Sequence, residues 1–209
     1  MDSLPVDVII VPDDKTQRKA RELGKIIADN FDYYYTIADN RLIPHATVYQ
    51  AQYPVKNLEK IKNKLKDLSA SFKTFEISIG PYQNHHGYIW WNFQENENIS
   101  SLHLRLLREL NSLRENLLLP FLTPKGYKTG EEFTKEEVEN VRKYGAVVVD
   151  KLFKPHITLA KLKEDVGESK LYDILGRKKQ RFLVSEISVG KMGDYGTVTR
   201  ILESYSMKS

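Results

Sequence analysis

Cysteine is absent from the 209-residue sequence, so disulfides, thiolate nucleophiles and cysteine-based zinc sites are excluded. A reducing compartment is compatible with this composition. Long apolar runs are missing as well, and no stretch approaches the ~20 apolar residues of a membrane-spanning helix. The first residues show neither the basic region nor the apolar run of a secretory signal. We therefore expect a cytoplasmic protein that does not enter a membrane.

A strong excess of one charge is also lacking. The chain has 32 basic and 28 acidic residues, a formal net charge of +4 and a pI near 9.0. This mild, interspersed excess permits an anionic ligand but does not indicate tight binding of duplex nucleic acid. Walker loops, dinucleotide-binding glycine motifs and Ser-His-Asp signatures are not found. The length fits one domain or two small lobes.

One five-residue pattern occurs twice. Residues 44–48 read Pro-His-Ala-Thr-Val, and residues 155–159 read Pro-His-Ile-Thr-Leu. Because side chains alternate between the two faces of a strand, the histidine and the threonine of each copy share a face. The apolar residues between them take the opposite face, which suits packing against helices. Each copy therefore predicts a strand that presents an imidazole beside a hydroxyl.

The repeat extends beyond this motif. After each copy comes a charged helical stretch and then the string Glu-Ile-Ser-β-branched-Gly, at 76–80 and again at 186–190. A strand-like run also precedes the helix that leads into each motif, at 6–11 and 88–93. Two copies of one α/β unit are the simplest account, since a solenoid needs three or more units. We expect two lobes related by a pseudo-twofold axis, with the motifs facing each other.

Hydrophobic periodicity predicts the remaining elements. Helices are expected at 14–30 with Asp13 or Asp14 as cap, at 58–71 opened by Asn57, at 101–117 capped by Ser100 or Ser101, and at about 166–179. Strands are expected at 6–11, 42–50, 74–81, 87–94, 152–161, 181–191 and 196–207.

Residues 118–150 break the symmetry of the two copies. They contain prolines and glycines and then a short helix, with Thr134 and Glu137 as a capping box and Gly145 as its stop. We expect one bilobal domain over 1–209, with 118–150 as an inserted segment. The insertion either forms a lid that selects substrate or decorates an edge of the fold.

The paired motifs resemble those of the 2H phosphoesterases. The second motif, 153–161 (Phe-Lys-Pro-His-Ile-Thr-Leu-Ala-Lys), is similar to the 2′-5′ RNA ligase-like, cyclic nucleotide phosphodiesterase branch. The first motif departs from that branch, because it continues Tyr-Gln-Ala-Gln-Tyr-Pro at 49–54 instead of an apolar-aromatic-leucine-glycine run. The architecture matches over nearly the whole chain, but only about ten residues carry specific identity. The resemblance implies an α+β fold, with two pseudo-symmetric α/β lobes and largely antiparallel sheets flanking a central cleft.

Two histidines and two threonines suit the chemistry of a cyclic phosphate. Opening a 2′,3′-cyclic phosphate needs a base that deprotonates water and an acid that protonates the leaving ribose oxygen, and the ~6.5 pKa of histidine allows both roles. The resemblance implies His45 as general acid and His156 as general base. Thr47 and Thr158 would hold the non-bridging oxygens. No metal or other cofactor is required in this scheme.

Two further residues are candidates for substrate binding. Lys161 corresponds to a basic position that follows the second motif in the family, although its strand parity requires a strand end or bulge to bring it to the site. Tyr49 shares parity with His45 and Thr47 and is a candidate for stacking on a nucleobase. His85-His86 fits a solvated turn better than a metal site, and His103 fits a structural role.

The leading hypothesis is a metal-independent phosphodiesterase that converts 2′,3′-cyclic phosphates to 2′-phosphates. Its partners would be RNA 3′ ends or small nucleotides with a cyclic phosphate, and we expect it to act as a monomer. A second enzymatic hypothesis is cleavage of 2′-5′ phosphodiester linkages or an RNA ligase-like reaction. A third is a non-catalytic module that binds RNA ends.

Overall fold

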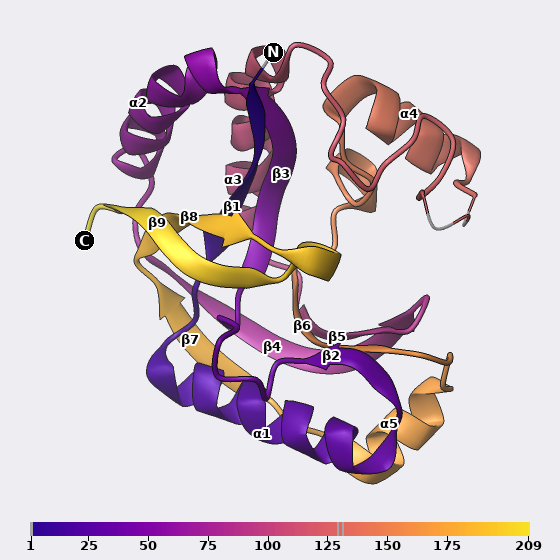
Figure 1. Ribbon diagram of the computed structural model, residues 1–209. Coiled ribbons are helices and arrows are strands. Elements are labelled where there is room, and N and C mark those ends of the chain that lie inside the picture. Colours follow the sequence, from indigo (N-terminus) through magenta and orange to yellow (C-terminus); the bar gives the residue numbers. More distant parts are fainter. Residues whose placement is uncertain (1, 129, 131) are drawn as a thin grey trace.

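Two antiparallel sheets form the centre of the protein (Figure 1). The computed structural model describes residues 2–128, 130 and 132–209. The first sheet has the order β3-β1-β8-β9 and consists of β3 (Ala46–Pro54), β1 (Ser3–Ile10), β8 (Glu186–Met192) and β9 (Val198–Ser206). The second sheet has the order β2-β6-β5-β4-β7 and consists of β2 (Tyr33–Thr36), β6 (His156–Leu162), β5 (Tyr88–Phe93), β4 (Phe75–His85) and β7 (Gln180–Val184). The predicted α+β class with antiparallel sheets is confirmed.

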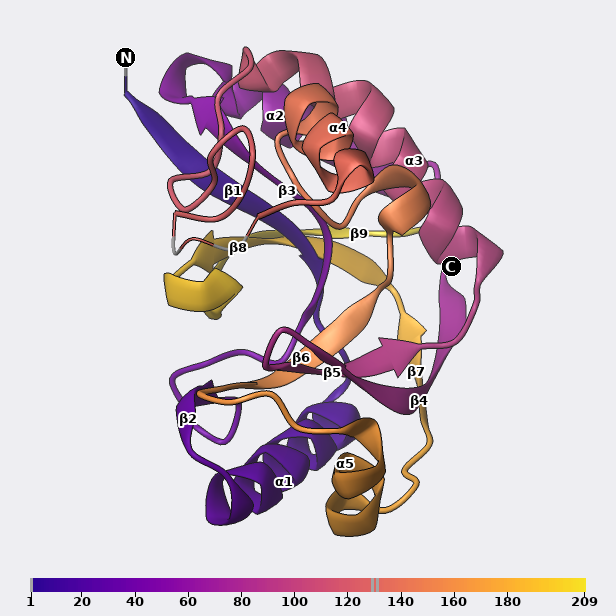
Figure 2. The same cartoon turned by 90° about the vertical axis from the view of Figure 1, so that its right-hand side faces the viewer.

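Helices cover the outer side of each sheet (Figures 1 and 2). The first sheet carries α2 (Leu58–Ser69) and α3 (Glu97–Leu110), and the second carries α1 (Asp14–Asn30) and α5 (Glu168–Leu175). Helix α1 has the predicted bounds, and Asp13 caps it by accepting a hydrogen bond from the Thr16 amide at 2.8 Å. Leu23 and Ile27 on its inner stripe are fully buried, so the amphipathic pattern positions this helix on the sheet.

Each sheet combines strands from both sequence repeats. The first Glu-Ile-Ser-β-branched-Gly string lies in β4, within the sheet of the second motif, whereas the second string lies in β8, within the sheet of the first motif. The helices follow the same rule, since α1 packs against β6 and α3 packs against β3. The two repeats are therefore interleaved, and neither forms a lobe by itself.

One predicted strand is two strands in two different sheets. The run 181–191 divides at Ser185, with β7 in the second sheet and β8 in the first. The apolar alternation changes phase there, because the buried residues are Phe182 and Val184 before the division and Ile187 after it. An alternation that skips one position marks a strand that changes the face it buries.

The predicted helix ends are correct at some places and wrong at others. Helix α3 begins at Glu97, because the Asn96 side chain caps it by accepting hydrogen bonds from the amides of Asn98 and Ile99. The expected serine cap is therefore wrong. It ends at Leu110 and passes into a 3₁₀ turn. Helix α5 is shorter than predicted and stops at Gly176, which has φ +63°. No helix within the described part of the chain is long and apolar enough to cross a membrane.

The segment 118–150 forms a small apolar cluster of its own beside the first sheet. It contains α4 (Lys135–Tyr144), which begins with the predicted Thr134–Glu137 capping box and ends at Gly145 with φ +72°. Buried residues of the segment, among them Leu119 and Val141, pack together with Met192 of β8. The Arg114 guanidinium, 2 % exposed, donates to the carbonyls of Leu117, Arg142 and Lys143, the last two in the final turn of α4. This buried cation fixes the C-terminal end of α4 to the rest of the protein.

Candidate active site

Both motifs lie at the start of a strand, the edge strand β3 in the first sheet and the internal strand β6 in the second, and both strands carry the same irregularity. His45 directly precedes β3, and His156 is the first residue of β6. In β3 the register skips Val48, since Ile9 lies opposite Thr47 and Val8 lies opposite Tyr49. In β6 it skips the residue after Thr158 in the same way. Each motif strand therefore has a β-bulge one residue after its threonine.

The bulge reverses the prediction for Tyr49. The expectation that Tyr49 shares a face with His45 and Thr47 is wrong, because the extra residue turns the following side chain to the opposite face. Tyr49 is 1 % exposed, and its hydroxyl donates to the Tyr144 carbonyl at 2.9 Å. It is a core residue that attaches α4 to the first sheet.

The same irregularity explains Lys161. The bulge after Thr158 restores Lys161 to the face of His156, as its role requires. The Lys161 ammonium donates to the His86 carbonyl and lies 4.4 Å from the centre of the Tyr88 ring. The lysine therefore contributes its charge to the rim of the site while it remains tied to the β4–β5 turn.

The two catalytic candidates are held in the same way. Nδ1 of His45 donates to the Ile43 carbonyl at 2.8 Å, and Nδ1 of His156 donates to the Lys154 carbonyl at 2.7 Å. A carbonyl oxygen can only accept, so in both neutral rings the proton lies on Nδ1 and the lone pair lies on Nε2. In each motif Nε2 is thus the ring atom that can accept a proton from water or carry one to a leaving group.

Burial disfavours the protonated form of both imidazoles. It lowers the pKa of His45, and hydrogen bonds with the backbone of Ile43 and Gly196 oppose the change. Burial also lowers the pKa of His156 to about 3, with the Lys154 carbonyl opposing and the charges of His45 and His85 contributing. The two rings are therefore close enough for the charge of one to affect the proton affinity of the other.

The neighbours of His45 form the first half-site, which consists of His45, Thr47 and Asp7. Asp7 lies in the middle of β1, is fully buried, and has Oδ2 3.8 Å from Nε2 of His45. The Thr47 hydroxyl donates to the same oxygen at 3.1 Å. Burial raises the pKa of Asp7 well above its usual range, and the Thr47 hydrogen bond opposes this. Asp7 was not among the predicted site residues, although a single carboxyl group in the apolar run 6–11 was a visible signal.

The second half-site, which consists of His156, Thr158, Tyr35 and Lys161, has aromatic neighbours. The His156 ring stacks on Trp90 with centroids 3.9 Å apart, and Trp90 stacks on His85 at 4.4 Å. Burial raises the pKa of the Tyr35 hydroxyl, and a hydrogen bond with Thr158 opposes the change. Trp90 is 5 % exposed, and it packs against the candidate base.

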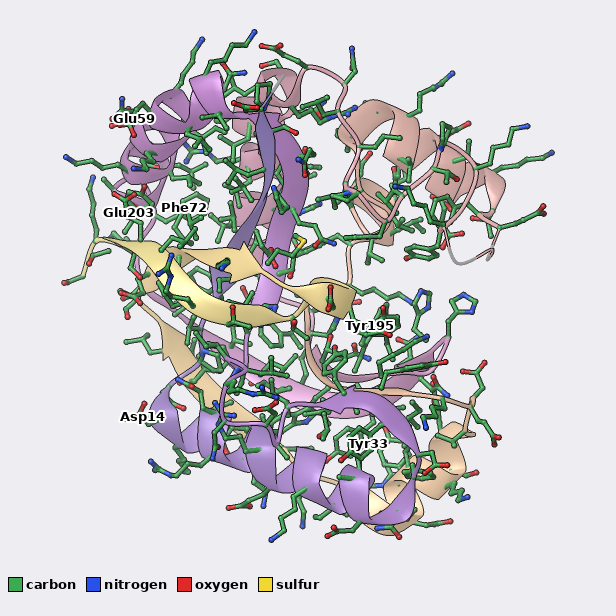
Figure 3. All side chains as sticks on the ribbon, viewed as in Figure 1. Asp14, Tyr33, Glu59, Phe72, Tyr195 and Glu203 are labelled. Carbon is green, nitrogen blue, oxygen red and sulfur yellow. The ribbon has the colours of Figure 1, made fainter. Side chains whose placement is uncertain are left out.

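A tyrosine cluster connects the two sheets beside this site. Tyr195, in the turn between β8 and β9, stacks on Tyr34 at 5.6 Å and on Tyr35 at 5.8 Å, both in β2 (Figure 3). Tyr34 is 55 % exposed and Tyr195 is 46 % exposed. Tyr195 has φ +57°, a left-handed conformation that is uncommon for a bulky residue. These exposed rings form an apolar surface beside the second half-site, and neither of them was predicted as a site residue.

The remaining histidines have other surroundings. His103 is 1 % exposed, stacks on Phe153, bonds the Val48 carbonyl through Nδ1, and accepts a hydrogen bond from the Asp150 amide at Nε2. Burial lowers its pKa to about 4, which fits the structural role predicted for it. His85 and His86 lie at the β4–β5 turn. Within the described residues, no group of three or more His, Asp or Glu side chains could hold a metal ion.

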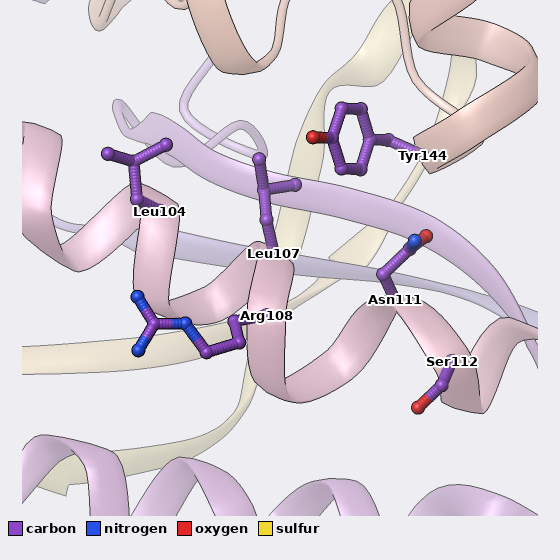
Figure 4. A pocket seen from close by; sticks show the side chains of 6 residues that line it. All are labelled: Leu104, Leu107, Arg108, Asn111, Ser112 and Tyr144. Carbon is purple, nitrogen blue, oxygen red and sulfur yellow. The ribbon is translucent and has the colours of Figure 1, made fainter.

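A pocket lies between α3 and α4 (Figure 4). Its lining residues are Leu104, Leu107, Arg108, Asn111, Ser112 and Tyr144. None of them belongs to either half-site, and the polar groups of Asn111 are already bonded to Lys143 and Arg114.

The site and the fold can be compared with known proteins. A family model described as the 2′-5′ RNA ligase superfamily matches residues 12–196. TT0787 of Thermus thermophilus is similar in structure over 99 % of both chains, with 16 % identity and a TM-score of 0.61. LigT of E. coli complexed with 3′-AMP is similar over 100 % of both chains, with 12 % identity and a TM-score of 0.57. The same protein complexed with phosphate gives 12 % identity, the same coverage and a TM-score of 0.54. No curated protein sequence matches this chain.

Proposed function

We propose, since the chain belongs to the 2′-5′ RNA ligase superfamily, that it is a phosphodiesterase that opens 2′,3′-cyclic phosphates to 2′-phosphates. The observation that carries this proposal is the pair of imidazoles, one from each sheet, with both Nδ1 positions bonded to the backbone carbonyl two residues earlier. A displacement at phosphorus needs an acid and a base on opposite sides, and this arrangement supplies one of each.

The reaction assigns a role to each motif residue. Nε2 of His156 takes a proton from water, and the water oxygen bonds to phosphorus. The bond from phosphorus to the ribose 3′ oxygen breaks, and that oxygen takes the proton from Nε2 of His45, which leaves a 2′-phosphate. The hydroxyls of Thr47 and Thr158 lie beside the two histidines, where they can contact the non-bridging oxygens. Burial disfavours the imidazolium form of His45, and a bound anionic phosphate opposes this and promotes its protonation.

The substrate class follows from the surroundings of the histidines. LigT of E. coli has been crystallised with 3′-AMP, ATP and phosphate, ligands that share a phosphate group. In this protein the exposed rings of Tyr34 and Tyr195 offer a surface on which a nucleobase can stack, which is worth roughly 1–3 kcal/mol per base. We therefore propose small nucleotides and single-stranded RNA ends as substrates.

The first test is hydrolysis of 2′,3′-cyclic AMP in the presence of EDTA, with the products separated by chromatography. We expect 2′-AMP from the wild type and loss of turnover in H45A and H156A. H86A is the matched control, because it removes an imidazole from the β4–β5 turn and should keep its activity. Abolition by EDTA with rescue by an added metal ion would contradict the metal-independent scheme.

Two other substrates separate the alternatives. Turnover of a 2′-5′-linked dinucleotide without turnover of the cyclic nucleotide would replace the proposed reaction by cleavage of 2′-5′ linkages. If neither is turned over, binding of a 3′-phosphorylated RNA oligonucleotide that strengthens as pH falls would indicate a non-catalytic module, since protonated imidazoles attract phosphate.

A further inference from the structure

Asp7 is a buried ionisable side chain that has no role in the two-histidine scheme. It lies in the middle of β1, is fully buried, and has one hydrogen bond, from Thr47 to Oδ2. Its other oxygen, Oδ1, is buried without a partner among the described residues. A carboxyl group in this position carries a cost of burial, because nothing compensates one of its oxygens. Such a group beside a candidate catalytic residue needs an explanation.

The two half-sites differ at this point. Asp7 lies opposite Gln50, the third residue after Thr47, and the equivalent position in the second half-site is Tyr88, which lies opposite Lys161. The first half-site thus contains a carboxyl group, whereas the second contains a phenol and an ammonium group. The two motifs have the same backbone but opposite electrostatic surroundings.

Few other groups face Asp7 and His45. Asp7 lies opposite Gly190 of β8 and Gln50 of β3, neither of which titrates. The His45 ring is bonded to the backbone at Ile43 and Gly196. From the second sheet His156 is the group whose proton affinity depends on the charge of His45. The state of His45 is therefore set by its immediate neighbour Asp7 and by the bound phosphate.

We propose that Asp7 is a positioning residue that holds a proton at the first half-site, so that His45 delivers the proton to the leaving group and His156 remains the base. This inference rests on the proposed function. Asp7 and His45 share one proton: the carboxylate next to Nε2 favours the imidazolium, and the carboxylic acid is the resting form when His45 is neutral. Because Asp7 is fully buried it does not touch the substrate, and it acts through His45.

With this assignment, bonds and protons balance over one catalytic turnover. His45 gives its proton to the ribose 3′ oxygen as the bond from that oxygen to phosphorus breaks. Asp7 can then return a proton to Nε2 over the 3.8 Å that separates the two atoms, after a small side-chain movement. His156 releases to solvent the proton that it took from water, and the Asp7–His45 pair takes one back. One water molecule is consumed in each turnover.

The test is the D7N variant, in which Asn keeps the size of the side chain and an acceptor for Thr47. The pKa of each imidazole is measured by NMR on histidine labelled with ¹⁵N, with signals assigned from H45A and H156A. We expect D7N to lower the pKa of His45 by at least about one unit, a tenfold loss of proton affinity, with a smaller change at His156. D29N, which removes an exposed carboxylate from α1, is the matched control for net charge.

This measurement needs no turnover, so it separates the role of Asp7 from the proposed function. An unchanged or raised pKa of His45 in D7N would overturn the proposal, whether or not the protein hydrolyses cyclic phosphates. Where turnover is found, the alkaline limb of the kcat/KM profile should move to lower pH by the same amount, which a purely structural effect would not produce. If D7N does not fold, D7A removes the same carboxyl group, and the same outcomes apply to it.

Discussion

The two half-sites share their backbone and differ in their side-chain neighbours. Both have a histidine whose Nδ1 donates to the carbonyl two residues earlier, and both have a bulge directly after the threonine. The first histidine lies beside the carboxyl group of Asp7, whereas the second stacks on the indole of Trp90. The repeated backbone places the imidazoles, and the neighbours that are not repeated decide which of them carries the proton.

The largest effect on the rate is expected from variants that remove either of the two histidines. H45A and H156A should each lower kcat for 2′,3′-cyclic AMP by about 10²–10⁴-fold, the usual contribution of a positioned acid or base. Because the two imidazoles serve one displacement, the double variant should lose little more than the worse single variant. Losses that multiply fully would show that the two histidines act independently, and would contradict a single two-sided site.

The next comparison concerns Trp90, which has Ile9 as its counterpart in the first half-site. A base acts only when unprotonated, and the pKa of His156 is lowered to about 3, so kcat/KM should not fall on the acidic side between pH 7 and pH 5. W90L opens the ring to water, so its pKa should rise towards ~6.5 and the rate should fall over that interval. I9V is the control and should leave kcat/KM unchanged between pH 7 and pH 5. If W90L and the wild type have the same pH dependence on the acidic side, burial by Trp90 is not what lowers the pKa of His156.

Removing either threonine hydroxyl should lower the free energy of unfolding, but by different amounts. T47V removes the hydrogen bond of a buried carboxyl group and should lower the free energy of unfolding by about 1–3 kcal/mol. T158V removes a bond between two neutral hydroxyls, those of Thr158 and Tyr35, and should cost about 1 kcal/mol. Urea unfolding at pH 7 measures both. A larger loss in T158V would reverse the order expected from the burial of Asp7.

The smallest effect is expected at Lys161. Its ammonium group is engaged by the His86 carbonyl and the Tyr88 ring, at the rim of the site. K161Q should raise KM by no more than about fivefold at low salt, as expected for a charge that water and salt screen, and the difference should shrink at high salt. K163Q, two residues further along the chain and exposed, is the control and should leave KM unchanged. A large fall in kcat in K161Q would place the lysine at the phosphate.

The sequence predicted the motif residues and the antiparallel fold, because both depend on local patterns. The alternation of side chains correctly placed Ala46 and Ile157 in the core and their neighbours on the site face. It failed one residue after Thr47, because a bulge inserts a residue without leaving a mark in the sequence. This bulge reversed the predicted position of Tyr49, and the matching bulge after Thr158 supplies the irregularity that the role of Lys161 required.

The neighbours of the histidines could not be predicted from the sequence, for a different reason. Asp7, Trp90 and Tyr195 lie far from the motifs along the chain, and only the pairing of strands brings them to the site. Asp7 was the exception that left a signal, since a carboxyl group in an otherwise apolar strand is costly. Tyr195 left none, because it lies in a turn whose position depends on the length of β8 and β9.

The interleaving of the repeats has a consequence for how this molecule can be divided. A cut within 118–150 would give an N-terminal fragment with β1 to β5 and a C-terminal fragment with β6 to β9, and neither would contain a whole sheet. Separated, each fragment would expose the edges of unfinished sheets and tend to aggregate. Expressed together, the fragments complete each other, so the protein should behave as a split enzyme whose two imidazoles meet only on reassembly.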